Sequence, residues 1–251
     1  MLLLDSFTPT QLATIAAAYF IAAVVKGVTG VGYSTTCLPI LTLAIGLKEA
    51  LPLVIIPSVT SNLAVMVGVG SFKVTAVRFW PLLISAVTAV FLGIWTLSLI
   101  NGANAAAVLG VVLIIYVAFA LANSNFRLCE AKSRRFEPVV GAMTGFINGL
   151  TGSQVMPLVP YLLSLNLERS RFLQASNQSF TISSAAMLVG LGTVGLLTLP
   201  AAIVSLCGLV LVGIGVPLGQ RISCHLSPEM FRKAVLIVLA VLGFTLILRA
   251  I

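Results

Sequence analysis

The stretch GFINGLTGSQ, residues 145–154, interrupts an apolar segment that extends over about residues 138–166. The arms on its two sides, about 138–149 and 153–166, are each too short to cross a membrane, because a helix rises about 1.5 Å per residue and the apolar core of a bilayer is about 30 Å thick. Glycine and small polar residues at the centre of such a segment favour a turn over a continuous helix. The stretch therefore predicts a re-entrant hairpin with its tip at membrane depth.

A similar interruption, KGVTGVGYS at residues 26–34, lies in the apolar stretch of residues 10–46. Laying one interruption over the other pairs Gly30 with Gly149, Gly32 with Gly152, and Ser34 with Ser153. In each half a short charged gap follows, and then come a helix with a polar centre and two more helices. The sequence therefore predicts a twofold internal repeat.

The repeat divides the chain into three parts. The first repeat covers residues 1–122, the second covers 138–251, and a polar linker at 123–137 separates them. Each repeat is expected to hold one broken helix pair and three transmembrane helices. The broken pairs are 10–46 and 138–166, and the further helices are 50–70, 79–100, 104–122, 170–191, 198–219 and 232–250.

Composition places these helices in lipid. Hydrophobic residues make up 59% of the chain, charged residues only 8%, and the mean hydropathy is +1.16. A soluble domain carries about 25% charged residues, so this chain has too few to cover a water-facing surface. The expected fold class is an all-α integral membrane protein, and we expect it in the inner membrane of a bacterial cell with lipid as a partner.

Charged gaps give the orientation. Residues 71–78, 123–137 and 220–233 are rich in Lys and Arg, whereas 101–103 and 192–197 carry no charge. The positive-inside rule places the basic gaps in the cytoplasm. The two repeats are then inverted relative to each other, and the two hairpins enter from opposite faces. Eight plain crossings are the alternative, but that topology would place Arg221, Arg232 and Lys233 outside.

The interruptions suggest an anion site. Helices that begin after them, near Ser34 and Ser153, would direct free N–H groups and a positive dipole end at the tips. Inverted repeats with broken helices and a site near the midplane are typical of secondary transporters. The candidate binding residues in the two interruptions are Thr29, Gly30, Gly32, Ser34, Thr35, Asn148, Gly149, Gly152, Ser153 and Gln154. The alternative for the glycines is helix packing.

Three further polar residues lie within apolar segments. Lys26 would be a cation at membrane depth, where it needs an anionic partner, so it is a candidate for offsetting the charge of a ligand. Its alternative is to snorkel to the interface. Asn62 and Asn177 occupy similar places in the two halves and are candidates for a shared polar cavity, with interhelical hydrogen bonding as the alternative.

Other functional classes are excluded on motif grounds. The four cysteines, Cys37, Cys129, Cys207 and Cys224, form no C-x-x-C pair, and His225 is the only histidine, so we expect no metal site and no cofactor. No carboxylate pair lies within a predicted helix and no hydrolase or nucleotide-binding motif occurs, so an enzyme is not expected. The basic residues, among them Arg127 and Lys132, do not form a stripe with aromatic residues, so a nucleic-acid partner is not expected.

At its two interruptions the chain resembles the sulfite exporter TauE/SafE family, also called the 4-toluene sulfonate uptake permease family. The resemblance rests on GVTGVG leading to Leu38-Pro39, on GFINGLTG leading to Pro157, and on the polar helices with Asn62 and Asn177. It implies transport of a small anion, such as sulfite or a sulfonate. Protons are a candidate coupling ion, because an acidic substrate can carry its own proton. An anion channel and a non-transporting membrane scaffold are the alternatives.

Overall fold

The computed structural model describes residues 7–122, 133–224 and 228–250, and within these ranges it contains helices and no strand. Most of the predicted linker, including Arg127, Cys129 and Lys132, lies outside the described residues, as does His225. The helices are α1 Pro9–Thr29, α2 Tyr33–Ile45, α3 Leu47–Val69, α4 Phe72–Arg78, α5 Trp80–Leu99, α6 Gly102–Leu121, α8 Glu137–Thr151, α9 Leu158–Ser164, α10 Arg169–Thr193, α11 Leu199–Ser223 and α12 Pro228–Leu248.

Six of the described helices are long and apolar enough to cross a membrane, namely α1, α3, α5, α6, α11 and α12. This confirms the fold class. The helix predicted at 170–191 is present as α10, which is 25 residues long, although its polar composition leaves it outside these six. Its polar side chains, such as Gln174 and Asn177, are buried against other helices. The predicted gap at 71–78 is likewise a short helix, α4.

Both interruptions are shorter than the sequence suggested. α1 continues through Lys26 to Thr29 and ends at Gly30, where φ is 77°. α8 continues through Asn148 to Thr151 and ends at Gly152, where φ is 74°. Both capping glycines adopt the left-handed conformation that residues with a Cβ avoid. The structure therefore pairs Gly30 with Gly152 and Lys26 with Asn148, in place of the pairing that we predicted.

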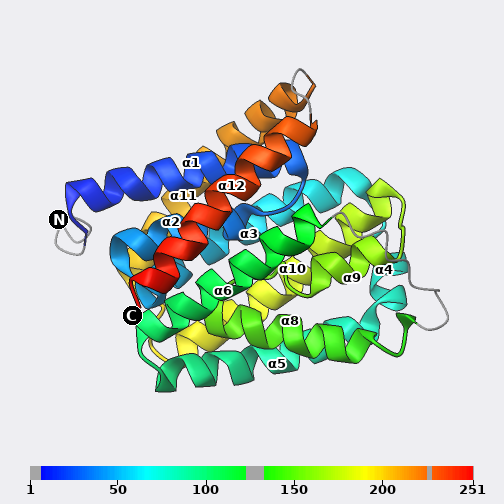
Figure 1. Ribbon diagram of the computed structural model, residues 1–251, viewed down its shortest axis with the longest axis horizontal. Helices are drawn as coiled ribbons and strands as arrows, with labels where there is room; N and C mark the ends of the chain where they lie inside the picture. The colour runs from blue at the N-terminus through cyan, green and yellow to red at the C-terminus, as the bar shows by residue number, and fades with distance from the viewer. Residues whose placement is uncertain (1–6, 123–132, 225–227, 251) are drawn as a thin grey trace.

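The second broken segment turns back on itself. α8 has 15 residues, about 22 Å at about 1.5 Å per residue, which is less than a bilayer core. The hydroxyl of Tyr161 in α9 donates to the carbonyl of Ser133 at 3.2 Å and lies 3.4 Å from Glu137 Oε1 at the start of α8. The chain thus returns to the end from which α8 began. Figure 1 shows the corresponding turn between α1 and α2 at the first break.

Each half of the chain packs mainly against the other half. α1 lies along α11 and α8 lies along α5, so the first arm of each broken pair contacts the same kind of helix from the opposite half. α3 packs against α10, and α6 packs against α12. Exchanging the two halves therefore turns the α1–α11 contact into the α8–α5 contact, and it leaves the α3–α10 and α6–α12 contacts as they are.

Glycines allow the two arms to approach their partners closely. A Cβ on Gly27 would lie 2.2 Å from the carbonyl oxygen of Val216, and one on Gly149 would lie 2.1 Å from that of Val90. Close backbone contact through small residues is the common packing mode of membrane helices. It also explains why α1 and α8 continue through these glycines and break only at Gly30 and Gly152.

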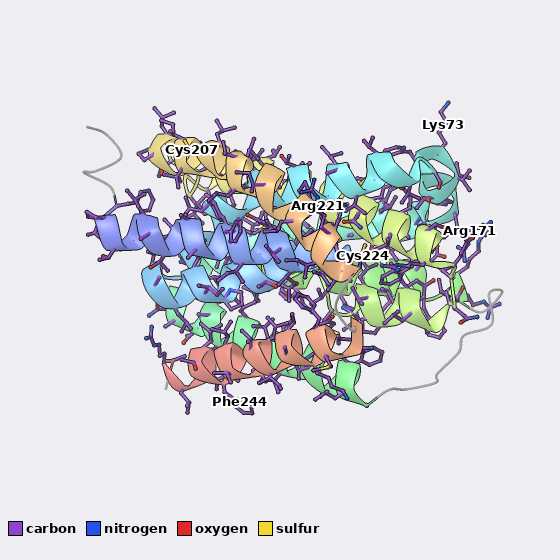
Figure 2. All side chains as sticks on the ribbon, turned by 90° about the horizontal axis from the view of Figure 1, so that it is seen from above. Lys73, Arg171, Cys207, Arg221, Cys224 and Phe244 are labelled. Carbon is purple, nitrogen blue, oxygen red and sulfur yellow. The ribbon has the colours of Figure 1, made fainter. Side chains whose placement is uncertain are left out.

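Large apolar side chains cover the outside of the bundle. Trp95, Val210 and Phe244 are each more than half exposed, as lipid contact would require. Figure 2 shows Phe244 on the outer side of α12, and Lys73 and Arg171 together at one end of the molecule. The two chain termini lie at the other end (Figure 1).

The predicted orientation can be checked by labelling. In a variant without native cysteines, we expect Lys73→Cys to react with a membrane-impermeant maleimide only from the cytoplasm and Asn101→Cys only from outside, because α5 alone separates the two ends. Asn101 and Lys73 are both exposed, so access depends on the side of addition. Labelling of both residues from the same side would contradict the predicted topology.

Candidate functional site

The first break exposes the start of a helix. α2 begins at Tyr33 after Gly32, and no side chain caps it. The first backbone bond of the turn runs from the N–H of Thr36 to the carbonyl of Gly32, so the N–H groups of Tyr33, Ser34 and Thr35 have no acceptor within the helix. Together with the positive end of the helix dipole, such groups attract an anion.

A cavity of about 410 Å³ lies against this helix start. Thr29, Gly32, Thr35 and Thr36 contribute to its lining from the first break. Aromatic side chains of α6, α10 and α12 form much of the remaining wall, and two cations, Arg169 and Arg232, also line it. The cavity therefore combines an uncapped helix start, hydroxyl groups and positive charge within an otherwise apolar wall.

The lining residues show which end of the molecule the cavity faces. Some of them come from the last turns of α6 and α11 and from the first turns of α10 and α12, and others come from the two breaks and from α9. The ends of α6 and α11 and the start of α12 adjoin basic gaps that the sequence places in the cytoplasm. On that orientation the cavity faces inward.

The two breaks meet at a second, much smaller space. It has a volume of about 10 Å³, roughly the space of one water molecule, and Ser34, Gly152 and Gln154 contribute to its lining from the two breaks. Ser34 shares a hydrogen bond of 2.8 Å with Ser58 of α3, and Gln154 Nε2 donates to Ser184 Oγ at 2.6 Å. The contact between the breaks is thus polar and nearly closed.

Lys26 lies in a closed cluster beside the first break. Its side chain is fully buried, and Nζ donates to Asn62 Oδ1 at 2.5 Å and to Asn177 Oδ1. Asn177 Nδ2 in turn donates to the carbonyl of Gly30 at 3.1 Å. Lys26 therefore does not snorkel to the surface, and the two asparagines from α3 and α10 meet at one cation.

The second break is built differently from the first. The helix after it begins at Leu158, not near Ser153 as we predicted, because Pro157 and Pro160 suit only the beginning of a helix. The side chains of Asn148 and Ser153 are fully buried, and neither Asn148 Oδ1 and Nδ2 nor Ser153 Oγ has a partner among the described residues. The short α9 does not supply the predicted helix N-terminus, so the backbone donors come from the first break.

The predicted site residues thus form several groups rather than one. Thr29, Gly32 and Thr35 line the large cavity, whereas Ser34, Gly152 and Gln154 line the small space. Lys26, Asn62 and Asn177 form the buried cluster with the Gly30 carbonyl. Gly149 packs against α5, and Asn148 and Ser153 are enclosed without partners.

Arg169 and Arg232 were not predicted as lining residues. Arg232 lies in the basic gap 220–233, which we interpreted only as an orientation signal, and Arg169 lies in the short charged gap that we interpreted only as part of the internal repeat. Arg232 also donates from Nη2 to the carbonyl of Ala120 at 2.7 Å, which fixes the head of its side chain near the end of α6. Arg232 reaches the cavity because α12 packs against α6, and Arg169 reaches it because α10 begins beside the cavity. No local sequence pattern could have identified either arginine as a lining residue.

These features define a multi-pass membrane protein whose two broken helices gather polar groups inside an apolar bundle. A family model described as sulfite exporter TauE/SafE matches residues 15–246, nearly the whole chain. The chain belongs to this family of membrane transporters. No curated protein and no solved structure matches it.

Proposed function

We propose that the protein is a secondary transporter that moves a small sulfur oxyanion, such as sulfite or a sulfonate, through the inner membrane of a bacterial cell. The observation that carries the proposal is the uncapped start of α2, where Gly32 and Thr35 line a cavity that Arg169 and Arg232 also line. Backbone N–H groups and arginines are the donors that oxyanions favour. The family relationship supports the same class of substrate.

Alternating access explains why the cavity beside α2 is large and the space between the two breaks is small. In the proposed cycle the anion enters the large cavity, passes the contact between the two breaks, and leaves at the opposite face. The reciprocal packing of the two halves supports a movement of one inverted repeat against the other. The closed contact at Ser34, Gly152 and Gln154 would then be the barrier in the inward-facing state.

The closed barrier also favours a transporter over a channel. A conducting anion channel needs a continuous polar path, whereas the space between the breaks holds about one water molecule. A scaffold protein would not need an uncapped helix start beside a cavity that two arginines line. Saturation of uptake at low substrate concentration separates transport from channel flux.

A thermal-shift screen of the purified protein tests the substrate class. A ligand that binds only the folded state raises the unfolding temperature in proportion to the logarithm of its concentration well above its Kd. We expect stabilisation by sulfite, thiosulfate or a sulfonate, and none by the choline or ammonium cation as the chloride salt. Absence of any concentration-dependent shift with these anions and with small carboxylates would reject an anion site.

The role of the cavity arginines is testable with matched variants. We expect Arg232→Gln to raise the KM for anion uptake about tenfold or more, because a hydrogen bond to a charged group contributes about 1.5–3 kcal/mol and a factor of ten is about 1.4 kcal/mol. Lys233→Gln is the control, since Lys233 is exposed beside it and does not line the cavity. Equal effects of the two variants would remove Arg232 from the site.

A further inference from the structure

Lys26 is a buried cation without a counter-ion. It lies in an apolar helix of 21 residues, and none of its surface is exposed. Among the described residues no carboxylate forms an ion pair with it, and its partners are the neutral side chains of Asn62 and Asn177. A charge at membrane depth without a counter-ion is costly. The structure therefore needs either a bound anion or a neutral lysine to relieve that cost.

Titratable groups on the neighbouring helices do not supply the missing charge. The helices that contact α1 carry these titratable or charged residues within the described side chains: Tyr33 and Cys37 on α2, Lys48 and Glu49 on α3, Arg169 and Arg171 on α10, Cys207 and Arg221 on α11, and Arg232 and Lys233 on α12. None of them bonds to Lys26. No neighbouring charge therefore fixes Lys26 in its protonated form, so a bound anion can decide whether Lys26 holds its proton.

The cluster has hydrogen-bonding groups for both protonation states. A charged lysine has three N–H donors, of which two reach the asparagine oxygens, and the third has no partner among the described residues. Asn62 Nδ2 is also buried without a partner. When Lys26 is neutral, its nitrogen lone pair can accept this unused N–H after the Asn62 amide turns. A cation with a purely structural role would have no use for that spare donor.

We propose that Lys26 is the proton-binding site of the transport cycle and that one proton moves with each anion. This inference rests on the proposed function and adds the coupling ion to it. On release, the Nζ–H bond breaks, the electron pair remains on nitrogen, and the proton goes to water together with the departing anion. Lys26 and the anion then carry no net charge together in the loaded state, and Lys26 carries no charge in the empty state, so neither form adds a net charge to the apolar interior.

The hydrogen bonds connect this site to the break that would move. Asn177 Oδ1 accepts from Lys26, while Asn177 Nδ2 donates to the carbonyls of Gly30 and Leu173. Loss of the proton weakens the first of these bonds and so loosens the hold of α10 on the end of α1. Thr29 and Gly32, on either side of Gly30, line the cavity. Proton release and a change at the anion site are therefore linked through Asn177.

Two substitutions test the coupling with the full chain in liposomes. Lys26→Arg keeps the charge but cannot release a proton at any accessible pH. Asn62→Asp keeps the side-chain shape and places a carboxylate against Lys26, which holds the proton in place. Lys26→Arg should therefore bind the anion and exchange it across the membrane, yet fail to complete a net cycle. In Asn62→Asp the new carboxylate neutralises Lys26, so the loaded state carries a net negative charge and both exchange and net uptake should fall.

The measurement uses a trapped pH dye and two radiolabelled probes, sulfite and methanesulfonate, with the membrane voltage clamped. Methanesulfonate carries no titratable proton near neutral pH, so any proton that moves with it belongs to the protein. We expect the wild type to acidify the lumen as methanesulfonate enters. Net uptake by both variants should fall about tenfold or more with lumenal pH unchanged, while anion exchange should be retained in Lys26→Arg and lost in Asn62→Asp. Lys73→Arg, an exposed control, should behave as the wild type.

The outcomes separate the two proposals. Wild-type uptake of methanesulfonate without a change in lumenal pH would overturn the coupling role of Lys26 and leave the transport function standing. Proton movement of wild-type size in both variants would overturn it as well. If the wild type moves neither anion, the proposed function itself is rejected.

Discussion

Gly145→Ala is expected to prevent the second hairpin from docking. A Cβ on Gly145 would lie 2.0 Å from the carbonyl oxygen of Ala86 in α5, and the backbone there has no rotamer through which to move away. The α5–α8 contact is the most extensive between described helices, so the two helices can only separate. Overpacking typically costs about 1–3 kcal/mol, and we expect this site at the upper end of that range.

Gly213→Ala is the matched control for this substitution. Gly213 also lies inside a helix, α11, but a Cβ there would meet no atom within 4 Å. Thermal unfolding of both purified variants in the same detergent gives the comparison. We expect a clear fall in the unfolding temperature for Gly145→Ala and none for Gly213→Ala. Equal unfolding temperatures would show that the close α5–α8 contact does not stabilise the fold.

Arg78→Met is expected to destabilise the base of the same hairpin. Arg78 Nη1 bonds to Glu137 Oε1, and the carboxylate of Glu137 is fully buried at the start of α8. Removing the arginine leaves this carboxylate without its cation, and breaking a buried ion pair in this way costs about 3–5 kcal/mol. The Tyr161 hydroxyl, 3.4 Å from the same oxygen, is too weak a donor to replace the arginine.

A double substitution distinguishes the ion pair from a general effect of losing an arginine. Arg78→Met with Glu137→Gln removes both charges and should recover much of the lost stability, whereas Arg135→Met should be neutral because Arg135 is exposed in the turn before α8. Denaturant unfolding of the wild type, Arg78→Met, Glu137→Gln and the double variant gives the coupling energy between the two side chains. Additive effects of the two single substitutions would mean that the pair does not stabilise the hairpin.

The class of protein and most of its helices follow from local properties of the sequence. The lengths of the apolar runs predicted α3, α5, α6, α11 and α12 to within a few residues, because lipid requires about 20 apolar residues for each crossing. The two breaks were also found, because glycine at a left-handed position is a local requirement. Their extent was overestimated, since Gly27, Gly145 and Gly149 serve close helix contacts that a single segment does not show.

The candidate site could be predicted only in part. Lys26, Asn62 and Asn177 were each conspicuous as polar residues in apolar surroundings, and a buried cation must find polar partners, so their convergence follows from the same physics. Arg169 and Arg232 gave no such signal, because an arginine in a charged gap between apolar segments is common in any membrane protein. Their part in the cavity depends on how α10 and α12 are placed beside the first break.

By itself the sequence determined that the chain lies in a membrane, which of its segments are apolar helices and that two of these segments are broken, because these properties depend on neighbouring residues and on the solvent they meet. The tertiary structure decided which polar groups share a space. That choice depends on the rotation of each helix about its axis and on contacts between halves of the chain that are far apart in sequence. Gly149 therefore faces α5, while Gly32 faces the cavity.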